Sequence, residues 1–137
     1  MKTTPRTKAW DAFSRYIRAR DAIKTTGTID YCVCITCGRI YPTFGVGCIQ
    51  AGHFVPGRWT SVLFDEECTN GQCYGCNCKQ GGMWVEYEAV MVQRHGQDKV
   101  DEMKRRKHKS VRYYKSDYRD IEDKYKQKLN ELKGGEK

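Results

Sequence analysis

Four of the eight cysteines have the spacing of metal ligands. They form two C-x-x-C pairs, Cys34 with Cys37 and Cys73 with Cys76, and 35 residues separate the pairs. Each pair can offer two thiolates to one ion, and two pairs complete the tetrahedral four-sulfur site that Zn²⁺ favours. A thioredoxin-like redox pair fits less well, because neither pair follows the strand of a βαβ pattern. We therefore predict a structural zinc site.

The other four cysteines are Cys32, Cys48, Cys68 and Cys78. Cys32 and Cys78 each lie two residues from a cysteine of a pair and compete as ligands, but two C-x-x-C pairs are the simpler set. We expect the remaining cysteines to be small core residues. Zinc with four sulfur ligands has no open position for water, so reactive groups must lie elsewhere.

A candidate reactive centre lies between and just after the cysteine pairs. His53 follows Gly52 between the pairs, and Asn77 directly follows the second pair. A lone histidine between strands is by default a structural side chain. The order C-x-x-C, then Gly-His, then Q-C-x-x-C-N is nonetheless that of a zinc-stapled ββα unit. In such a unit a hairpin presents the histidine, and a helix beginning at the second pair presents the asparagine.

Length and composition limit what surrounds these residues. The 137 residues are one domain's length, so we expect residues 1–137 to form a single domain. Charged residues make up 31%, and no apolar run approaches the roughly 20 residues that cross a bilayer, which argues against a membrane protein. The start of the chain lacks the apolar core of a secretory signal. We therefore expect a cytoplasmic protein, where clustered cysteines bind metals rather than form disulfides.

Basic residues concentrate at two places that flank an acidic middle. Residues 1–24 carry a net charge of +5, residues 25–103 carry −4 and residues 104–119 carry +7, whereas residues 120–137 are balanced. Basic segments around a compact centre suit a phosphate backbone, although a solubilising surface has the same composition.

Apolar periodicity predicts the elements that hold the centre. Residues at spacings of three and four predict an N-terminal basic helix over 8–24, and further helices over 84–93, 97–108 and 116–133. Residues 31–82 show short apolar pairs broken by Gly and Cys and need a metal to order them. The predicted class is α+β, with a small zinc-bound ββα core over 31–95. The N-terminal helix and a basic C-terminal helical region over 97–133 flank this core.

The same residues resemble HNH (His-Me finger) nucleases, whose zinc-bound core is treble-clef-like, and specifically the NinG family of lambdoid phages, also called Rap. The matching stretches also occur outside the cysteine pairs, and QC-x-x-CN followed by Gly81 is similar to a zinc-bound endonuclease of T-even phages that cleaves Holliday junctions as a dimer. In order, the stretches are FSRYIRARD, CITCG, AGHF, FDEE, QCYGCN, RHGQDKVDEM and YKQKLNEL.

The resemblance implies a structure-specific DNA endonuclease that cleaves recombination intermediates such as Holliday junctions and D-loops. It implies that the four paired cysteines hold zinc, that His53 is the general base and that Asn77 is a ligand of a catalytic Mg²⁺ or Mn²⁺. These roles agree with the needs of phosphodiester hydrolysis, which are a base for the attacking water and a hard cation beside the phosphate.

Two departures from the general HNH pattern concern the cation site and the hairpin. Gly52 stands where many members have an aspartate ligand, as it does in the NinG family, so we expect the carboxylate to come from Asp65 or Glu66. The middle asparagine of the motif falls at Cys68, and we expect Asn70 to take over its hydrogen bonds or the loop to differ.

Basic and aromatic residues supply candidate DNA contacts. Arg58 follows His53 by five residues and is a candidate phosphate clamp, or else an exposed side chain without a role. A longer run has cations for phosphates and two tyrosines for exposed bases, unless it is simply a solvated helix face. This run comprises Lys104, Arg105, Arg106, Lys107, Lys109, Arg112, Tyr113, Tyr114 and Lys115.

Symmetric nicking of a junction suits a homodimer, and a recombinase is a further expected partner. An apolar stripe in the last helix is either the dimer seam or a face that packs on its own domain. Two other functions fit the sequence, namely a zinc-containing DNA-binding recombination accessory protein without catalysis and a generic HNH nicking nuclease. The stripe comprises Tyr118, Ile121, Tyr125, Leu129 and Leu132.

Overall fold

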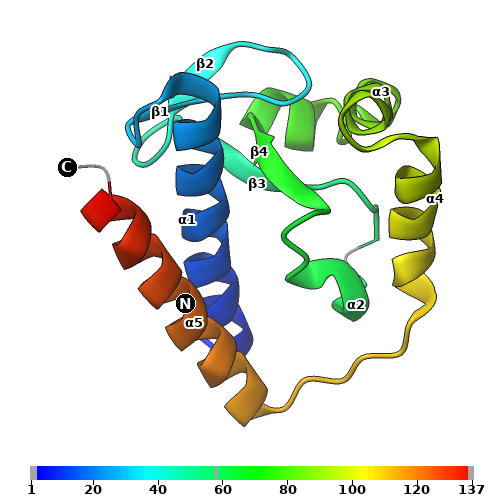
Figure 1. The fold of residues 1–137 in the computed structure, drawn as a ribbon. Coiled ribbons are helices and arrows are strands. Elements are labelled where there is room, and N and C mark those ends of the chain that lie inside the picture. Colours follow the sequence, from blue (N-terminus) through cyan, green and yellow to red (C-terminus); the bar gives the residue numbers. More distant parts are fainter. Residues whose placement is uncertain (1–2, 58, 136–137) are drawn as a thin grey trace.

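The computed structural model describes residues 3–57 and 59–135 and begins with a long helix, α1 (Pro5–Thr26) (Figure 1). The Thr4 side chain caps this helix by accepting a hydrogen bond from the backbone N–H of Thr7, and Pro5 occupies the first turn, where its missing N–H costs nothing. Gly27 ends the helix in the left-handed conformation at φ +80°. The predicted N-terminal helix is confirmed and is a few residues longer at each end.

Two small antiparallel sheets follow α1. The first pairs β1 (Tyr31–Val33) with β2 (Ile40–Pro42). The second pairs β3 (Gln50–His53) with β4 (Thr69–Gln72), so that Gly52 faces Asn70 and His53 faces Thr69. A long connection that contains the short helix α2 (Thr60–Leu63) joins the strands of the second sheet.

One turn of π-helix and four further helical segments complete the chain. The helices predicted over 84–93, 97–108 and 116–133 are confirmed, and no helix in the described ranges is both long and apolar enough to cross a membrane. The segments are η1 (Gly75–Lys79), α3 (Trp84–His95), α4 (Gln97–Arg105), η2 (Arg106–His108) and α5 (Lys115–Gly135).

Helices α1 and α5 lie side by side, on the opposite side of the second sheet from α3 and α4 (Figure 1). Phe13 on α1 packs edge-to-face on Tyr125 of α5, with ring centroids 4.9 Å apart. Ile121 and Leu132 pack against the same apolar cluster. The stripe on the last helix therefore packs on α1 of its own domain, which is the second of the two alternatives.

The sheets are held by apolar clusters and by cysteines. One cluster joins the connection after β3 to α3 and α4 through Phe54, Tyr87 and Met103. Another contains Ile49 together with Cys32 and three of the paired cysteines. The structure is thus a mixed α+β fold in which the first sheet has little apolar core of its own.

Candidate metal centre and catalytic cavity

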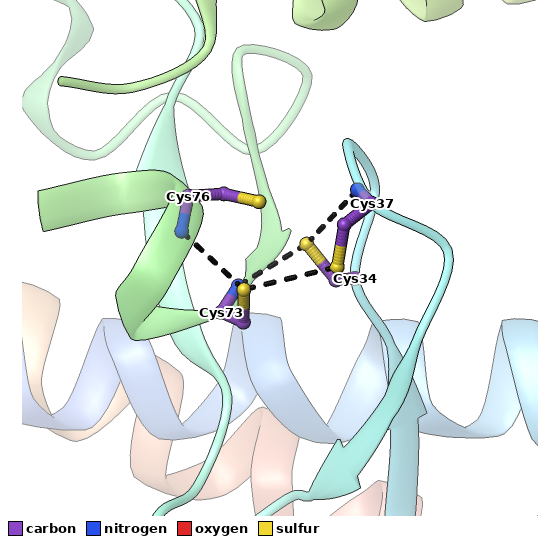
Figure 2. Close-up of side chains that lie close together, drawn as sticks. All are labelled: Cys34, Cys37, Cys73 and Cys76. Atoms are coloured by element: carbon purple, nitrogen blue, oxygen red, sulfur yellow. Dashed lines mark hydrogen bonds between the residues drawn. The ribbon is translucent and has the colours of Figure 1, made fainter. Parts of the chain in front are cut away.

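The four paired cysteines come together although 35 residues separate the pairs (Figure 2). Cys34 directly follows β1, Cys73 directly follows β4, and Cys76 lies in η1. All four Sγ atoms lie within 4.8 Å of one another, and those of Cys37 and Cys73 are 3.9 Å apart. Tetrahedral zinc with Zn–S bonds of about 2.3 Å separates its sulfurs by roughly 3.8 Å, so this donor set fits one zinc ion.

Backbone N–H groups point at these sulfurs. The N–H groups of Cys37 and Cys73 donate to Cys34 Sγ, at 3.5 and 3.3 Å, and that of Cys76 donates to Cys73 Sγ at 3.4 Å. Burial would raise the pKa of the Cys34 thiol, but these donors and the Thr36 hydroxyl outweigh it and lower the pKa to about 6. These hydrogen bonds favour the thiolate form of Cys34, which is the form that binds a metal.

The other four cysteines have two different surroundings. Cys32 and Cys68 are fully buried in apolar clusters, as expected of small core residues. Cys48 is half-buried and Cys78 is exposed, and both line a surface cavity. Within the described ranges, the paired cysteines are the one group of three or more His, Cys, Asp or Glu side chains close enough to share a metal ion.

His53 and Asn77 line one and the same cavity of about 550 Å³. His53 is the last residue of β3, and Asn77 lies in η1, which Cys73 and Cys76 tie to the metal centre. Trp10 contributes a wall from α1, and Gln50 contributes from the start of β3. The two side chains predicted to form a reactive centre are thus brought to a common space by the second sheet and the cysteine pair that follows it.

The imidazole of His53 is held on two sides. Its Nε2 lies 3.0 Å from the carbonyl oxygen of Leu63, and its ring stacks on Trp10 with centroids 5.0 Å apart and planes 25° apart. A carbonyl only accepts hydrogen bonds, so Nε2 carries the hydrogen and the lone pair of the neutral ring is on Nδ1. Trp10 and Leu63 therefore fix both the orientation and the tautomer of the histidine.

The amide of Asn77 is oriented by Gln50. Asn77 Nδ2 donates to Gln50 Oε1 at 2.9 Å, and the Cys78 thiol donates to the same oxygen at 3.5 Å. Because the nitrogen is used in this bond, Oδ1 is the Asn77 atom that can serve as a ligand. An amide oxygen suits a hard cation such as Mg²⁺ or Mn²⁺.

None of the carboxylates in residues 3–57 and 59–135 lines this cavity. Asp65 Oδ2 accepts from Arg106 at 2.9 Å, and its Oδ1 caps the turn that follows by accepting from the backbone N–H groups of Glu67 and Cys68. Glu66 instead accepts from Lys128 on α5. The expectation that Asp65 or Glu66 supplies the missing ligand is wrong, because both carboxylates are occupied elsewhere. Among the described residues that line the cavity there is no acidic side chain.

The structure explains why glycine precedes the histidine. A Cβ on Gly52 would clash with the buried Gln72 side chain, because it would lie only 2.9 Å from the Cβ of Gln72. Gln72 is fully buried, and its Nε2 donates to the carbonyl oxygen of Gly82. An aspartate at position 52 would need this side chain to move, so the more common HNH ligand does not fit here.

Asn70 faces away from the cavity and supports β3 from behind. Its Nδ2 donates to the hydroxyl of Tyr87 at 3.2 Å, and that hydroxyl donates to the carbonyl oxygen of Gly52 at 2.7 Å. Both side chains are buried. Asn70 is therefore a positioning residue for the strand that ends at His53 and does not itself line the cavity. Arg58, the candidate phosphate clamp, lies outside the described residues.

The candidate DNA-contacting run divides into paired and exposed side chains. Arg106 donates to Asp65, Glu67 and Glu102 over 2.7–2.9 Å, which raises its pKa further, and Lys104 pairs with Glu88. Tyr113 is half-buried and packs on Phe64 and Tyr118. Arg106 and Tyr113 thus make partly buried contacts within the chain, whereas the Lys104–Glu88 ion pair lies at the surface. The remaining members, of which Lys107 alone is half-buried, are Arg105, Lys107, Lys109, Arg112, Tyr114 and Lys115.

Sequence reasoning missed Trp10 and Gln50 as parts of this site. Trp10, Ser14 and Arg18 recur every four residues on α1, and all three line the cavity. That spacing marks one face of a helix and was a readable signal. Gln50 has no such signal, because its role depends on η1 folding back onto the beginning of β3.

Sequence comparison places this chain among phage proteins. The family model described as "Bacteriophage Lambda NinG protein" matches residues 5–136. The chain is 32% identical over 127 residues to Protein ninG of Escherichia phage 933W, which covers 92% of this chain and 57% of the relative. It is 30% identical to Protein ninG of Salmonella phage P22 and 29% identical to that of Escherichia phage lambda, over 56% of each relative. The chain therefore spans little more than half the length of these relatives, and no significant match was found among solved structures. The chain belongs to the NinG family.

Proposed function

We propose that the protein is a metal-dependent endonuclease of the HNH (His-Me finger) type that hydrolyses branched DNA, such as Holliday junctions and D-loops. The observation that carries the proposal is that His53 and Asn77 line one cavity. They do so from an antiparallel strand pair followed by a helical turn, which is the order of a ββα unit. The preference for branched substrates rests on the resemblance to recombination endonucleases alone.

In this function His53 takes the proton of the attacking water at Nδ1. The protonated ring is a cation, and both of its fixed neighbours stabilise a cation. The Leu63 carbonyl accepts a stronger hydrogen bond from a charged ring, and the face of Trp10 attracts positive charge. The surroundings of His53 therefore favour proton transfer to it.

Asn77 is the residue that would hold the cation, with its amide set by Gln50. When bound, Mg²⁺ or Mn²⁺ supplies positive charge beside the scissile phosphate and polarises the leaving oxygen. A neutral amide alone is a weak ligand, and Mg²⁺ is commonly held by protein groups together with substrate phosphates. Asn77 supplies one oxygen for such a site and the described lining residues add no carboxylate, so the substrate phosphates would have to supply the negative charge.

Two cations of the C-terminal region, Lys104 and Lys107, lie next to the His53 cavity. Lys107 lines a neighbouring cavity of about 240 Å³ that shares Val55, Pro56 and Trp84 with the His53 cavity. A DNA strand that enters the His53 cavity could therefore continue past Lys107 toward Arg105 and Lys109, whose side chains are exposed.

The test compares His53→Ala with His95→Ala, a matched change of an exposed histidine outside the cavity. We expect His53→Ala to lose cleavage of a Holliday junction in Mg²⁺ or Mn²⁺ by about 10²–10⁴-fold while junction affinity in EDTA stays unchanged. We expect Asn77→Ala to lose cleavage in a way that excess Mn²⁺ partly restores, and His95→Ala to cleave normally.

Two outcomes would overturn parts of the proposal. Junction binding without metal-dependent cleavage by the wild-type protein would indicate an accessory DNA-binding protein, a function that the cavity's lack of acidic lining residues in the described ranges favours. Equal cleavage rates for a junction and for linear duplex would indicate a generic nicking nuclease.

A further inference from the structure

One residue of α1, Arg18, brings a fixed positive charge to the candidate catalytic cavity. Trp10, Ser14 and Arg18 lie about one turn apart on α1, and all three line the cavity together with Asn77. Among the lining residues that the structure describes, Arg18 alone has a permanent charge. None of the sequence patterns singled it out, because it lies in a helix with many basic residues.

The guanidinium of Arg18 is held entirely by neutral groups. Nη1 donates to the carbonyl oxygen of Thr43 at 3.2 Å and to Cys48 Sγ at 3.3 Å, and Nε donates to the carbonyl oxygen of Ser14 at 3.2 Å. The ring of Phe44 lies 5.3 Å from the guanidinium carbon. Within the described ranges Nη2 has no hydrogen-bond partner, so this nitrogen has donors left for a ligand.

The neighbouring arginines of α1 differ in this respect. Arg15 is exposed and pairs with Asp11 at 3.0 Å. Arg20 pairs with the buried Asp21 at 2.9 Å and donates to the carbonyl oxygens of Glu66 and Thr69. Arg18 has no carboxylate partner among the described residues, so its charge is fixed in place without being neutralised by the protein.

We infer that Arg18 binds a non-bridging phosphate oxygen of the DNA strand that enters the cavity. A guanidinium held at a fixed position and lacking an internal counter-ion attracts an anion, and a phosphodiester offers one negative charge and oxygen acceptors. The cavity holds no competing acidic side chain in the part that is described. The inference rests on the proposed function and specifies where that site holds its substrate.

The test measures affinity for a Holliday junction in EDTA over a range of salt concentrations, so that it does not depend on cleavage. We expect Arg18→Gln to weaken binding roughly tenfold or more and to reduce the slope of log affinity against log salt by about one. Arg18→Lys should keep the slope. Arg15→Gln removes a charge from the same helix and is the matched control, with affinity and slope close to the wild type.

A purely structural role for Arg18 predicts a different pattern. Phe44→Leu loosens the support of the guanidinium but retains the charge, so we expect it to leave the salt slope unchanged. If Phe44→Leu and Arg18→Gln changed the slope equally, Arg18 would act by bracing the segment after β2, and the inference would be overturned.

A second measurement uses the unmodified protein. In NMR spectra we expect a dinucleoside monophosphate to shift the Nε–H signal of Arg18 and the indole N–H signal of Trp10. Shifts with inorganic phosphate but none with the diester would make this a site for free phosphate and overturn the assignment to DNA. Unaltered binding by Arg18→Gln in a protein that cleaves junctions would refute the Arg18 inference alone. If Arg18→Gln weakens junction binding as expected but the wild-type protein does not cleave junctions, the nuclease proposal alone would be refuted.

Discussion

The Nε2 atom of His53 lies 3.0 Å from the carbonyl oxygen of Leu63. This contact assigns the hydrogen to Nε2 and the lone pair to Nδ1. We predict that long-range ¹H–¹⁵N NMR spectra at pH values where the ring is neutral show the Nε2–H tautomer. A predominant Nδ1–H tautomer would contradict the assignment of Nδ1 as the proton acceptor.

Removal of the metal should unfold the part of the chain that the cysteines hold. We expect chelation, or Cys73→Ser, to remove near-UV circular dichroism and the hydrogen-exchange protection of residues 31–82, because the first sheet has little apolar core of its own. Cys48→Ser changes a cysteine outside the cluster and should leave both signals intact. Native spectra after a measured loss of zinc would show that the metal does not hold this region.

Two adjacent arginines should respond differently to the same substitution. Arg106 donates to three carboxylates, whereas Arg105 is exposed. We expect Arg106→Gln to lower the melting temperature by a few degrees, because Asp65 loses its charged partner in a partly buried site. Arg105→Gln should leave the melting temperature unchanged and reduce the salt slope of DNA binding by about one. The reverse pattern would mean that Arg106 is the residue that contacts DNA.

Acid should weaken the attachment of α5. Burial opposes ionisation of Glu66, but hydrogen bonds from Lys128 and Tyr125 outweigh it and hold the pKa of this carboxyl below its ordinary value of 4.5. A group whose pKa is lowered by folding stabilises the protein above its unfolded-state pKa and loses this contribution as pH falls through its folded-state pKa. We therefore expect Glu66→Gln to cost about 1 kcal/mol of unfolding free energy at pH 7 and progressively less as the pH falls below 4.5. Glu86→Gln, an exposed change on α3, should show no such pH-dependent difference.

The hydrogen bonds behind β3 are predicted to hold the strand. Tyr87→Phe removes the hydroxyl that donates to Gly52 and accepts from Asn70, and both of these partners are buried. We expect a loss of about 1–3 kcal/mol in the free energy of unfolding by urea. Tyr114→Phe is the control, because Tyr114 is exposed. Equal stability of the two variants would contradict the positioning role of Asn70 and Tyr87.

The long helices and the cysteine cluster were predictable because their signals are local or have one economical solution. Apolar residues at spacings of three and four placed α1, α3, α4 and α5, and two C-x-x-C pairs sufficed to select the four cysteines that the structure brings together. The convergence of His53 and Asn77 followed from the order of the motif around those pairs.

The predictions that failed or stayed open concern side chains whose partners lie far along the chain. Asp65 accepts a hydrogen bond from Arg106, which lies 41 residues later, and does not line the cavity. No property of the loop around Asp65 indicates that pairing. The apolar stripe of α5 has the same pattern whether it meets α1 or a second copy. Periodicity tells which face of a helix is buried but not what buries it.

The lack of acidic side chains in the described lining of the cavity also bears on when the proposed enzyme is active. A pocket lined by one arginine, two amides, two thiols and an imidazole offers little attraction to a free divalent ion, whereas an incoming phosphodiester brings the negative charge that such an ion needs. Nucleic acid and cation should then bind cooperatively, each tightening the other by the same factor as linkage requires. If the proposed function is right, the complete site forms only when DNA is bound, and without DNA the proposed nuclease would be inactive even at cellular magnesium concentrations.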